Sequence, residues 1–328
     1  MLAIGRSEVL EVLEGAESDV LGVIEAAYVA HARGLTSVPH SSFLRFPGDS
    51  VNRIIALPSY VGGGRPLAGI KWISSFPGNL SLGKERASAA ILLNRMDTGE
   101  PTSVLEGSVI SAKRTAASAA LAARVLMSSV GGASPSGVSL IGAGVINTEV
   151  TRFLRAVIPG LTGLTVHDAS PDRAKAFAER HSDLDVAVVD SAEEALAAHR
   201  LVSVATTATT PHLDTGPCAP GTVVLHLSLR DLFPEAVLRS RNVVDDTDHV
   251  CRAATSLELA ERSSGDRGFV HAEIGSLLSG DEELPADYDG TTVFSPFGLG
   301  VLDTALAGHV VDAAHARGLG TPVPNFLG

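Results

Sequence analysis

The chain has 328 residues, a length typical of about two domains, and its 45% hydrophobic residues are enough to build sizeable cores. The formal net charge is −12 and no segment gathers lysine and arginine into a stripe, which argues against a nucleic-acid partner. Cys218 and Cys251 show neither metal-ligand nor disulfide spacing, and no secretory signal or membrane span is evident, so we expect reduced thiols in a cytoplasmic protein.

The first third of the chain predicts one helix followed by short strands. Apolar residues recur at helical spacing between Ser18 and Arg33. Beyond them, β-rich runs are separated by glycine and proline clusters, a pattern typical of a strand-rich unit. The expected strands are Phe43–Phe46, Asn52–Pro58, Ala68–Ile73, Ala89–Leu93 and Pro101–Leu105.

An alanine-dense helix over Ser108–Met127 is expected to lead into a second domain. Strands and helices then alternate at steady spacing, which predicts an α/β fold with a doubly wound parallel sheet covered on both faces. A last helix at Val301–Arg317 is expected to pack back on the first unit. The strands expected in the second domain are Val138–Ile141, Leu164–His167, Leu201–Ala205, Thr222–Leu227 and Asn242–Val244.

A glycine motif follows the first strand of this second domain. Gly142 permits a tight turn, Gly144 removes a Cβ that would obstruct a pyrophosphate, and the next helix offers free N–H groups. The third small position is Asn147, so the match is imperfect. Asp168 ends the following strand, 24 residues beyond Gly144, close to the spacing of a ribose-binding acid. We predict a dinucleotide site; the alternative is an ordinary turn with a solvated aspartate.

Ligands of such sheets lie at the carboxyl ends of the strands, which predicts a single crevice for the cofactor. Asp168 favours NAD over NADP because a 2′-phosphate would meet a carboxylate, and Arg173 would soften that preference. The predicted cofactor-binding residues are Gly142, Ala143, Gly144, Val145, Ile146, Asn147, Asp168, Arg173, Thr206, Thr207 and Ser228.

Three cations lie within or beside elements of otherwise apolar pattern: Arg53, Lys71 and Arg114. Each alone could be a surface side chain whose stem packs on apolar neighbours. Three of them near a nucleotide crevice predict a clamp for substrate carboxylates, since a guanidinium matches a carboxylate bidentately. Arg86 is a weaker candidate for the same task.

Asp231 follows a buried strand at the nucleotide end of the sheet, where a carboxylate can exchange a proton with an amine or imine. The alternative is an N-cap for a helix starting near Pro234. His226, in the preceding strand, is expected to be a hydrogen-bonded core histidine rather than a catalyst. The remaining histidines show no ligand spacing, so no metal is expected.

Several segments carry a resemblance to a known family over nearly the whole chain. These are Gly69–Trp72, Met96–Pro101, Ser111–Ala117, Ile141–Gly144 and Thr206–Thr207, and with them the chain resembles the ornithine cyclodeaminase and mu-crystallin family. The resemblance implies a Rossmann domain over 116–300, and an α+β substrate-binding domain, usually the dimerisation domain, over 1–115 and 301–328. It also implies that Arg53, Lys71 and Arg114 hold the substrate α-carboxylate and that Asp231 acts on the amino group, with Asp231 and Lys71 as the catalytic residues.

The chain departs from the cyclodeaminases at Ser228–Asp231, where they carry Gly-Gly-Asp. With Trp72–Asn79, Arg86–Ala89 and Phe294–Gly300, it is similar to the branch that makes 2,3-diaminopropionate for siderophores and peptide antibiotics. That similarity implies NAD-dependent oxidative cleavage of N-(2-amino-2-carboxyethyl)-L-glutamate, with Arg86 and Arg230 meeting the additional carboxylates. The alternatives are an ornithine cyclodeaminase, a ketimine reductase, and a non-catalytic ligand-binding protein of mu-crystallin type.

Overall fold

The structure, a computed structural model, describes residues 1–131 and 134–326. The chain forms two compact units: unit 1 comprises Met1–Arg114 and Gly298–Gly328, and unit 2 comprises Thr115–Phe297. The sequence places the corresponding boundaries at 115/116 and 300/301. The roles expected for the two parts, substrate binding with dimerisation and cofactor binding, remain predictions.

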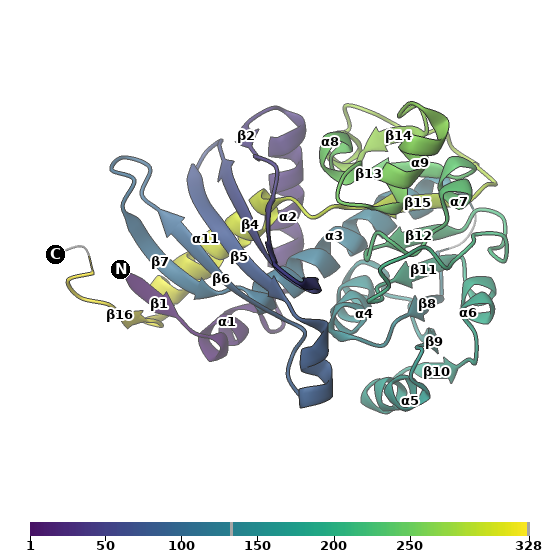
Figure 1. The fold of residues 1–328 in the computed structure, drawn as a ribbon, viewed down its shortest axis with the longest axis horizontal. Helices are drawn as coiled ribbons and strands as arrows, with labels where there is room; N and C mark the ends of the chain where they lie inside the picture. Colours follow the sequence, from purple (N-terminus) through teal and green to yellow (C-terminus); the bar gives the residue numbers. More distant parts are fainter. Residues whose placement is uncertain (132–133, 327–328) are drawn as a thin grey trace. The chain divides into compact units, whose positions relative to one another are not determined.

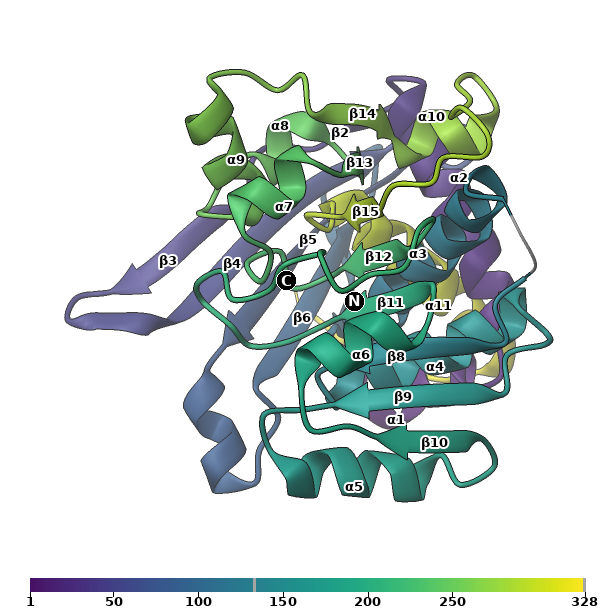
Figure 2. The ribbon, with the colours of Figure 1, turned by 90° about the vertical axis from the view of Figure 1, so that its right-hand side faces the viewer.

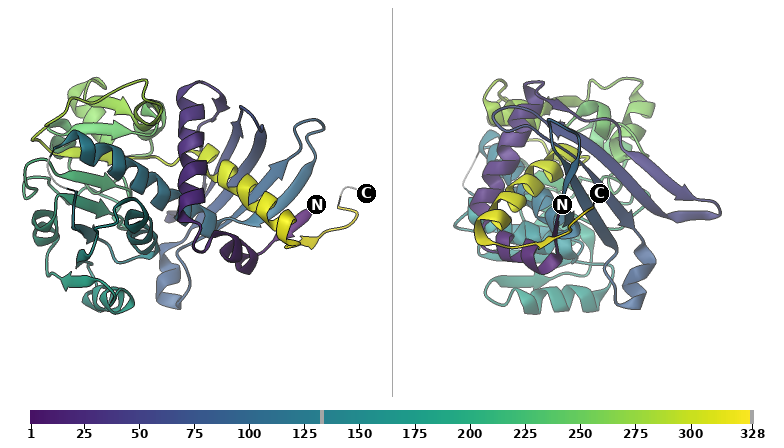
Figure 3. Two further views of the ribbon diagram at one scale, coloured as in Figure 1. Left: turned by 180° about the vertical axis from the view of Figure 1, so that it is seen from behind. Right: turned by 90° about the vertical axis from the view of Figure 1, so that its left-hand side faces the viewer.

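Unit 1 is built on one sheet with the strand order β16-β1-β7-β6-β5-β4-β2, and β3 pairs with β4. Its neighbours are antiparallel except for the parallel pair β1 and β7. Strand β1 also pairs with β16, so the two ends of the chain lie side by side (Figure 3). The strands are β1 (Leu2–Ile4), β2 (Thr36–Ser37), β3 (Ser42–Phe46), β4 (Asp49–Val61), β5 (Leu67–Ser75), β6 (Ala87–Asn94), β7 (Pro101–Glu106) and β16 (Thr321–Pro322).

Three helices pack on one face of this sheet: α1 (Arg6–Leu13), α2 (Glu17–Ala32) and α11 (Gly300–Arg317). The last of them crosses β4, β5 and β6, as the sequence predicts (Figures 1 and 3). Gly308 allows this close approach, because a Cβ there would lie 2.5 Å from the Leu67 side chain. A 3₁₀ helix, η1 (Pro77–Leu82), follows β5, and α3 (Ser108–Ser129) carries the chain from unit 1 into unit 2.

Unit 2 is a parallel sheet with the strand order β10-β9-β8-β11-β12-β15-β13-β14. The chain order reverses beside β8, and in sheets of this kind ligands bind at such a switch point. In this unit, the four-residue strands β10, β14 and β15 were not predicted from the sequence, and β15 joins parts of the chain that are far apart in the sequence by pairing with β12 and β13. The strands are β8 (Gly137–Ile141), β9 (Gly163–His167), β10 (Asp185–Val188), β11 (Leu201–Val204), β12 (Val223–His226), β13 (Arg241–Val244), β14 (Val270–Glu273) and β15 (Thr292–Ser295).

Helices cover both faces of the unit 2 sheet, with α4 and α6 on opposite sides of β8 (Figures 1 and 2). Ser191 caps α6 by accepting a hydrogen bond from Glu194 N at 3.1 Å. Ser170 is the N-cap of α5, with Pro171 next to it, but its side chain makes no capping bond. The helices are α4 (Val145–Val157), α5 (Pro171–Arg180), α6 (Ala192–Ala198), α7 (Pro234–Leu238), α8 (Thr247–Val250), α9 (Ser256–Ser264) and α10 (Ile274–Ser279).

Within the part of the chain that the structure describes, every helix is too short or too polar to cross a lipid bilayer.

Candidate functional site

The glycine turn of unit 2 leaves room for an anion at the start of α4. Gly142 has φ +96°, and a Cβ on it would lie 2.3 Å from Ala205 O, so only glycine fits there. Gly144 is the N-cap of α4, and a Cβ on it would meet only Arg173 Nη2, at 3.7 Å. The backbone N–H groups at the start of this helix are therefore open to a phosphate.

Asn147 explains the imperfect match of the motif. Its side chain is fully buried, and Nδ2 donates to Ile141 O at 3.1 Å and Gly142 O at 2.6 Å. Its Oδ1 accepts a hydrogen bond from Ser203 Oγ at 2.7 Å. A small residue at this position normally lets the helix approach the strand. Here the amide fixes the turn by bonding to it and to β11.

Asp168 is held beside this turn, and it is not the solvated aspartate of the alternative interpretation, since its side chain is only 9% exposed. Its carboxylate accepts hydrogen bonds from Ala143 N at 2.7 Å and Ser170 N at 2.9 Å. Arg173 Nη2 lies 3.7 Å from Asp168 Oδ2. A guanidinium therefore stands beside both the predicted ribose acid and the open side of Gly144.

Asp231 is the centre of a second cluster in unit 2. Its fully buried carboxylate accepts short hydrogen bonds from the hydroxyls of Thr206 and Ser228, and Oδ2 lies 3.4 Å from His226 Nε2. Burial raises the pKa of Asp231, but His226, Ser228 and Thr206 outweigh it, and the net pKa is lowered. The carboxylate is therefore ionised at neutral pH. His226 is buried, as expected, and it also binds Ser295 Oγ through Nδ1 at 3.1 Å.

The alternative interpretation of Asp231 as a helix cap is wrong, because the N-cap of α7 is Phe233. The turn before Asp231 is strained: Leu229 has φ +68°, a conformation that costs a non-glycine residue about 1–2 kcal/mol. In this chain the Leu229 side chain is buried in the hydrophobic core, which offsets the cost.

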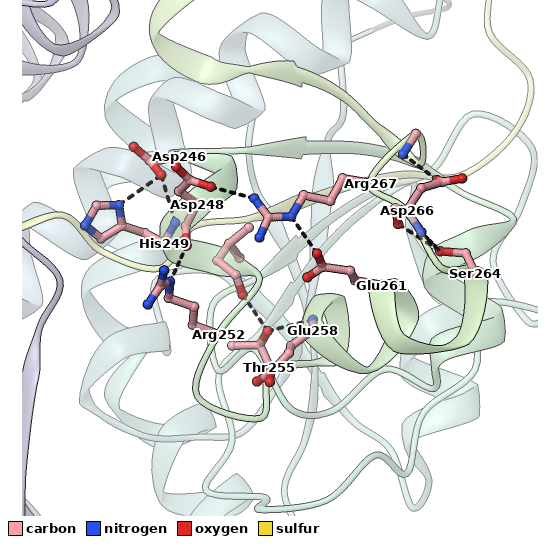
Figure 4. A network of polar contacts seen from close by, with 12 residues as sticks. Asp246, Asp248, His249, Arg252, Thr255, Glu258, Glu261, Ser264, Asp266 and Arg267 are labelled. Atoms are coloured by element: carbon pink, nitrogen blue, oxygen red, sulfur yellow. Dashed lines mark hydrogen bonds and ion pairs between the residues drawn. The ribbon is translucent and has the colours of Figure 1, made fainter.

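Arg230 is tied to the loop between α8 and α9. Its Nη2 donates to Ala253 O at 2.7 Å, and Leu229 O accepts from Ser256 N at 2.7 Å. Ala253 and Ala254 both have positive φ, +58° and +55°. The adjoining helices are fixed by a polar network in which Arg267 binds Asp248 and Glu261 while Thr255 caps α9 (Figure 4). Arg230, in the turn between β12 and α7, is therefore anchored to a neighbouring loop with two residues of positive φ, and such strain clusters at functional sites.

In unit 1, Lys71 and Arg114 share a carboxylate that the sequence analysis did not identify. Lys71 Nζ lies 2.6 Å from Asp303 Oδ2 and 3.3 Å from Ser111 Oγ, and Arg114 Nε lies 3.2 Å from Asp303 Oδ1. Lys71 is 2% exposed and Arg114 9%, so neither is a surface cation lying on apolar neighbours. The only available sequence signal for Asp303 was an acid in the otherwise apolar first turn of the last helix.

Arg53 and Arg86, also in unit 1, differ from Lys71 and Arg114 because they lie near other arginines rather than beside a carboxylate. Arg86 Nη1 donates to Ser75 Oγ at 2.9 Å. Burial lowers the pKa of both guanidinium groups; Arg45 lowers that of Arg53 further, and Arg53 lowers that of Arg86. Among the described residues, neither pairs with a carboxylate. Two partly buried cations without a counter-ion are the chemistry of an anion site.

The structure thus brings the predicted residues into two groups, one in each unit. The cofactor candidates gather at the carboxyl ends of β8, β9, β11 and β12, with Val145 exposed at the start of α4 and Thr207 exposed after β11. Of the cationic candidates in unit 1, Lys71 on β5 and Arg114 on α3 meet at Asp303, and Arg53 on β4 and Arg86 before β6 form a second pair. Arg230 lies in unit 2. Within 1–131 and 134–326, no group of three or more His, Cys, Asp or Glu side chains is arranged to hold a metal ion.

The parallel sheet with its glycine turn defines a Rossmann-like α/β protein, and the comparisons identify the family. Residues 6–318 match the ornithine cyclodeaminase/mu-crystallin family, to which the chain belongs.

Individual relatives cover nearly the whole chain. It is 28% identical to the N-((2S)-2-amino-2-carboxyethyl)-L-glutamate dehydrogenase of Staphylococcus aureus, over 98% of this chain and 97% of the relative. It is 27% identical to the alanine dehydrogenase of Archaeoglobus fulgidus, over 94% of each chain. Among solved structures, the Thermococcus litoralis Delta(1)-pyrroline-2-carboxylate reductase in complex with NADH and L-proline has a TM-score of 0.90 at 27% identity, with 98% of this chain and 100% of that chain covered. CmnK has a TM-score of 0.91 at 31% identity, with coverage of 99% and 98%.

Proposed function

We propose that this protein oxidises N-(2-amino-2-carboxyethyl)-L-glutamate with NAD⁺ and hydrolyses the resulting imine to L-2,3-diaminopropionate and 2-oxoglutarate. At the coarser level, the chain is an amino acid dehydrogenase or reductase of its family, and its cofactor is NAD. The observation that carries the finer assignment is Arg86, a partly buried cation that pairs with no carboxylate among the described residues. It comes in addition to Arg53, Lys71 and Arg114, which the resemblance assigns to the α-carboxylate, and so suits a substrate with further carboxylates.

The similarity to the Staphylococcus aureus dehydrogenase, whose substrate is this tricarboxylate, supports the proposal. Alanine dehydrogenase and pyrroline-carboxylate reductases are also relatives, and their names indicate substrates with fewer carboxylates. The additional cation Arg86 is the feature of this chain that favours the tricarboxylate over those substrates. The product amino acid would serve siderophore or peptide-antibiotic assembly, as the resemblance implies.

The glycine turn fits NAD on the observations given above: an open Gly144, free N–H groups at the start of α4, and Asp168 at the end of β9. When bound, NAD⁺ supplies the acceptor for the hydride that leaves the glutamate Cα. The turn and Arg173 would hold its phosphates, and Asp168 its ribose. The groups near Asp231, Thr206 and Ser228 among them, would border the nicotinamide end.

The side chains of each unit have separate tasks in this reaction. In unit 1, Lys71, Arg114, Arg53 and Arg86 bind carboxylates and so orient the Cα–H bond. In unit 2, ionised Asp231 accepts the amine proton as the C–N bond becomes an imine. Water then adds to the imine carbon, the proton returns to nitrogen, and the C–N bond breaks to release amine and ketone.

The direct experiment mixes the purified protein with NAD⁺ and the tricarboxylate, with ornithine, and with alanine, and follows NADH and products. Equal amounts of NADH, diaminopropionate and 2-oxoglutarate support the proposal. Proline from ornithine without net NADH would select a cyclodeaminase. NADH-dependent reduction of a cyclic imine would select a ketimine reductase. Ligand binding without turnover would select a mu-crystallin-type binding protein.

We also propose that the protein is a homodimer that joins through the sheet face of unit 1 opposite its helices. Strand register places apolar residues from β3 to β7 on this face, and Trp72 and Leu44 are 45% and 46% exposed. An apolar face of this kind marks an interaction surface. The face residues are Leu44, Ile54, Ala56, Pro58, Tyr60, Ile70, Trp72, Leu92 and Val104.

Trp72→Glu tests this surface, because it places a charge in the centre of the proposed contact. Sedimentation analysis should give a dimer for the wild-type chain and a folded monomer for the variant. Arg95→Glu, on the exposed turn between β6 and β7, is the control and should remain dimeric. A monomeric wild-type chain would contradict the proposal.

A further inference from the structure

Asp303 occupies a position that determines how Lys71 and Arg114 are held. It lies in the first turn of α11 and is fully buried. Its two oxygens are divided between two elements: Oδ2 binds Lys71 on β5 at 2.6 Å, and Oδ1 binds Arg114 on α3 at 3.2 Å. A carboxylate near a helix N-terminus is also favoured by the helix dipole. One acid therefore fixes two cations that come from segments far apart in the sequence.

Both cations keep donors that the protein does not use. Lys71 has a third ammonium N–H beyond those directed at Asp303 and Ser111. Arg114 binds Asp303 through Nε, and its terminal Nη1 and Nη2 have no hydrogen-bond acceptor among the described residues. Gly298 makes room for these nitrogens, since a Cβ there would lie 2.6 Å from Nη1. The terminal nitrogens of Arg114 can bind both oxygens of a carboxylate, and the Lys71 ammonium adds a localised positive charge and one more donor.

Asp303 also acts on the charge of Lys71. Burial, and to a smaller extent Arg114, lower the pKa of Lys71 and Asp303 raises it, with the net result that the pKa is lowered to about 8. These two are the charged groups that act on the ammonium. Without Asp303, the buried lysine would lose its proton at a lower pH and would no longer attract an anion.

We propose that Asp303 is the positioning residue of the substrate-carboxylate site: it fixes the Lys71 ammonium and the Nε side of Arg114 so that their unused N–H groups bind the carboxylate. This inference rests on the proposed function, in which these two cations meet substrate. Asp303 itself does not touch the substrate.

The test measures the affinity for 2-oxoglutarate, in the presence of saturating NADH, as a function of pH by calorimetry. The wild-type affinity should fall above about pH 8, where Lys71 loses its proton. Asp303→Asn should move this fall to lower pH and weaken binding at neutral pH about tenfold or more, since one unit of pKa is a tenfold change in proton affinity. Asp303→Glu should restore much of the affinity.

Thr304→Val is the matched control. Thr304 is the next residue of α11, equally buried, and its hydroxyl lies 2.6 Å from Ser59 Oγ, so the variant removes a buried polar contact without changing a charge. It should keep the wild-type pH profile. A folded Asp303→Asn protein with that same profile would overturn the inference, and NADH titration of every variant confirms that unit 2 remains intact.

A second measurement needs no substrate and so separates this inference from the proposed function. In the folded chain the pKa of Lys71 is about 8, against 10.5 for an ordinary lysine, so the unfolded chain binds more protons between these values. The Lys71 contribution to stability therefore rises with pH across that window. In Asp303→Asn the rise should begin at lower pH than in Thr304→Val. Identical profiles of Tm against pH would reject the role of Asp303, whereas a shifted profile without 2-oxoglutarate binding would reject only the proposed function.

Discussion

The two units bury charge in opposite ways. In unit 1, the cations Lys71 and Arg114 are held by one carboxylate, Asp303. In unit 2, the carboxylate of Asp231 is held by two hydroxyls and an imidazole, none of which carries a fixed charge. Removing one member of a buried ion pair destabilises the folded protein strongly, because the other charge stays buried without a partner. Removing one of several hydrogen-bond donors destabilises it less, because the remaining donors still bind the carboxylate.

This difference also suits the proposed chemistry of each cluster. Unit 1 must keep net positive charge for carboxylates, and a single acid between two cations leaves one in excess. Unit 2 must keep a carboxylate that can take and return a proton, and its pKa is lowered by the hydrogen bond and the charge of His226 and by the hydroxyls of Ser228 and Thr206, without a lysine or arginine.

The largest expected effect follows from removing the charge in unit 2. Asp231→Asn keeps the shape of the side chain but cannot accept the amine proton, so kcat should fall by about 10²–10⁴ or below detection. NADH affinity, measured by fluorescence titration, should change little. A large loss of NADH affinity would instead make Asp231 a structural residue, and the comparison between the two clusters would fail.

Stability gives the next contrast. Asp303→Asn leaves two buried cations without a counter-ion and should lower the free energy of unfolding by about 3–5 kcal/mol. Ser228→Ala removes one neutral donor and should cost about 1 kcal/mol. Urea unfolding of both variants measures the difference. Equal losses would show that unit 1 does not depend on charge pairing more than unit 2 does.

Arg86→Ala tests whether the Arg53 and Arg86 pair has a role separate from that of Lys71 and Arg114. Arg86 is assigned to an additional carboxylate, so its removal should cost about 1.5–3 kcal/mol of the substrate's binding free energy. KM for the tricarboxylate should therefore rise roughly tenfold to a hundredfold. Binding of NADH should not change. Arg95→Ala is the control, since Arg95 is exposed and pairs with Asp97. An unchanged KM in Arg86→Ala would remove the observation on which the finer assignment depends.

The smallest expected effect is a pH shift in unit 2. Ser228 is one of the groups that lower the pKa of Asp231. In Ser228→Ala this pKa should rise, so the acidic fall of kcat/KM should move to higher pH while the value at neutral pH changes only a few-fold. The pH profiles of the two proteins measure this directly. If the fall of kcat/KM at acidic pH did not move, the titration of Asp231 would not be its cause.

Much of the fold follows from local sequence signals. The alternation of strands and helices predicted the parallel sheet of unit 2, and the glycine turn predicted where its ligands would lie. Strands such as β15 were missed because four residues of polar and apolar character become a central strand only through pairing with β12 and β13. That pairing joins distant parts of the chain and leaves no local pattern.

The residues of the candidate site likewise fall into those that the sequence reveals and those that only the structure reveals. Lys71, Arg114 and Asp231 were recognisable because a charge within an apolar run is unusual. Asp303 could not be recognised in this way, because its partners Lys71 and Arg114 lie 232 and 189 residues away in the sequence. The role of Asn147 was likewise hidden: the motif marked it as a mismatch, and only the bonds to the turn explain it.

The central claim, hydride transfer from the glutamate Cα of an acidic secondary amine, is tested most directly with a substrate that carries deuterium at that carbon. The deuterium should be recovered in NADH, in amounts equal to the 2-oxoglutarate released. Retention of the deuterium in the amine, with no reduced cofactor formed, would contradict it.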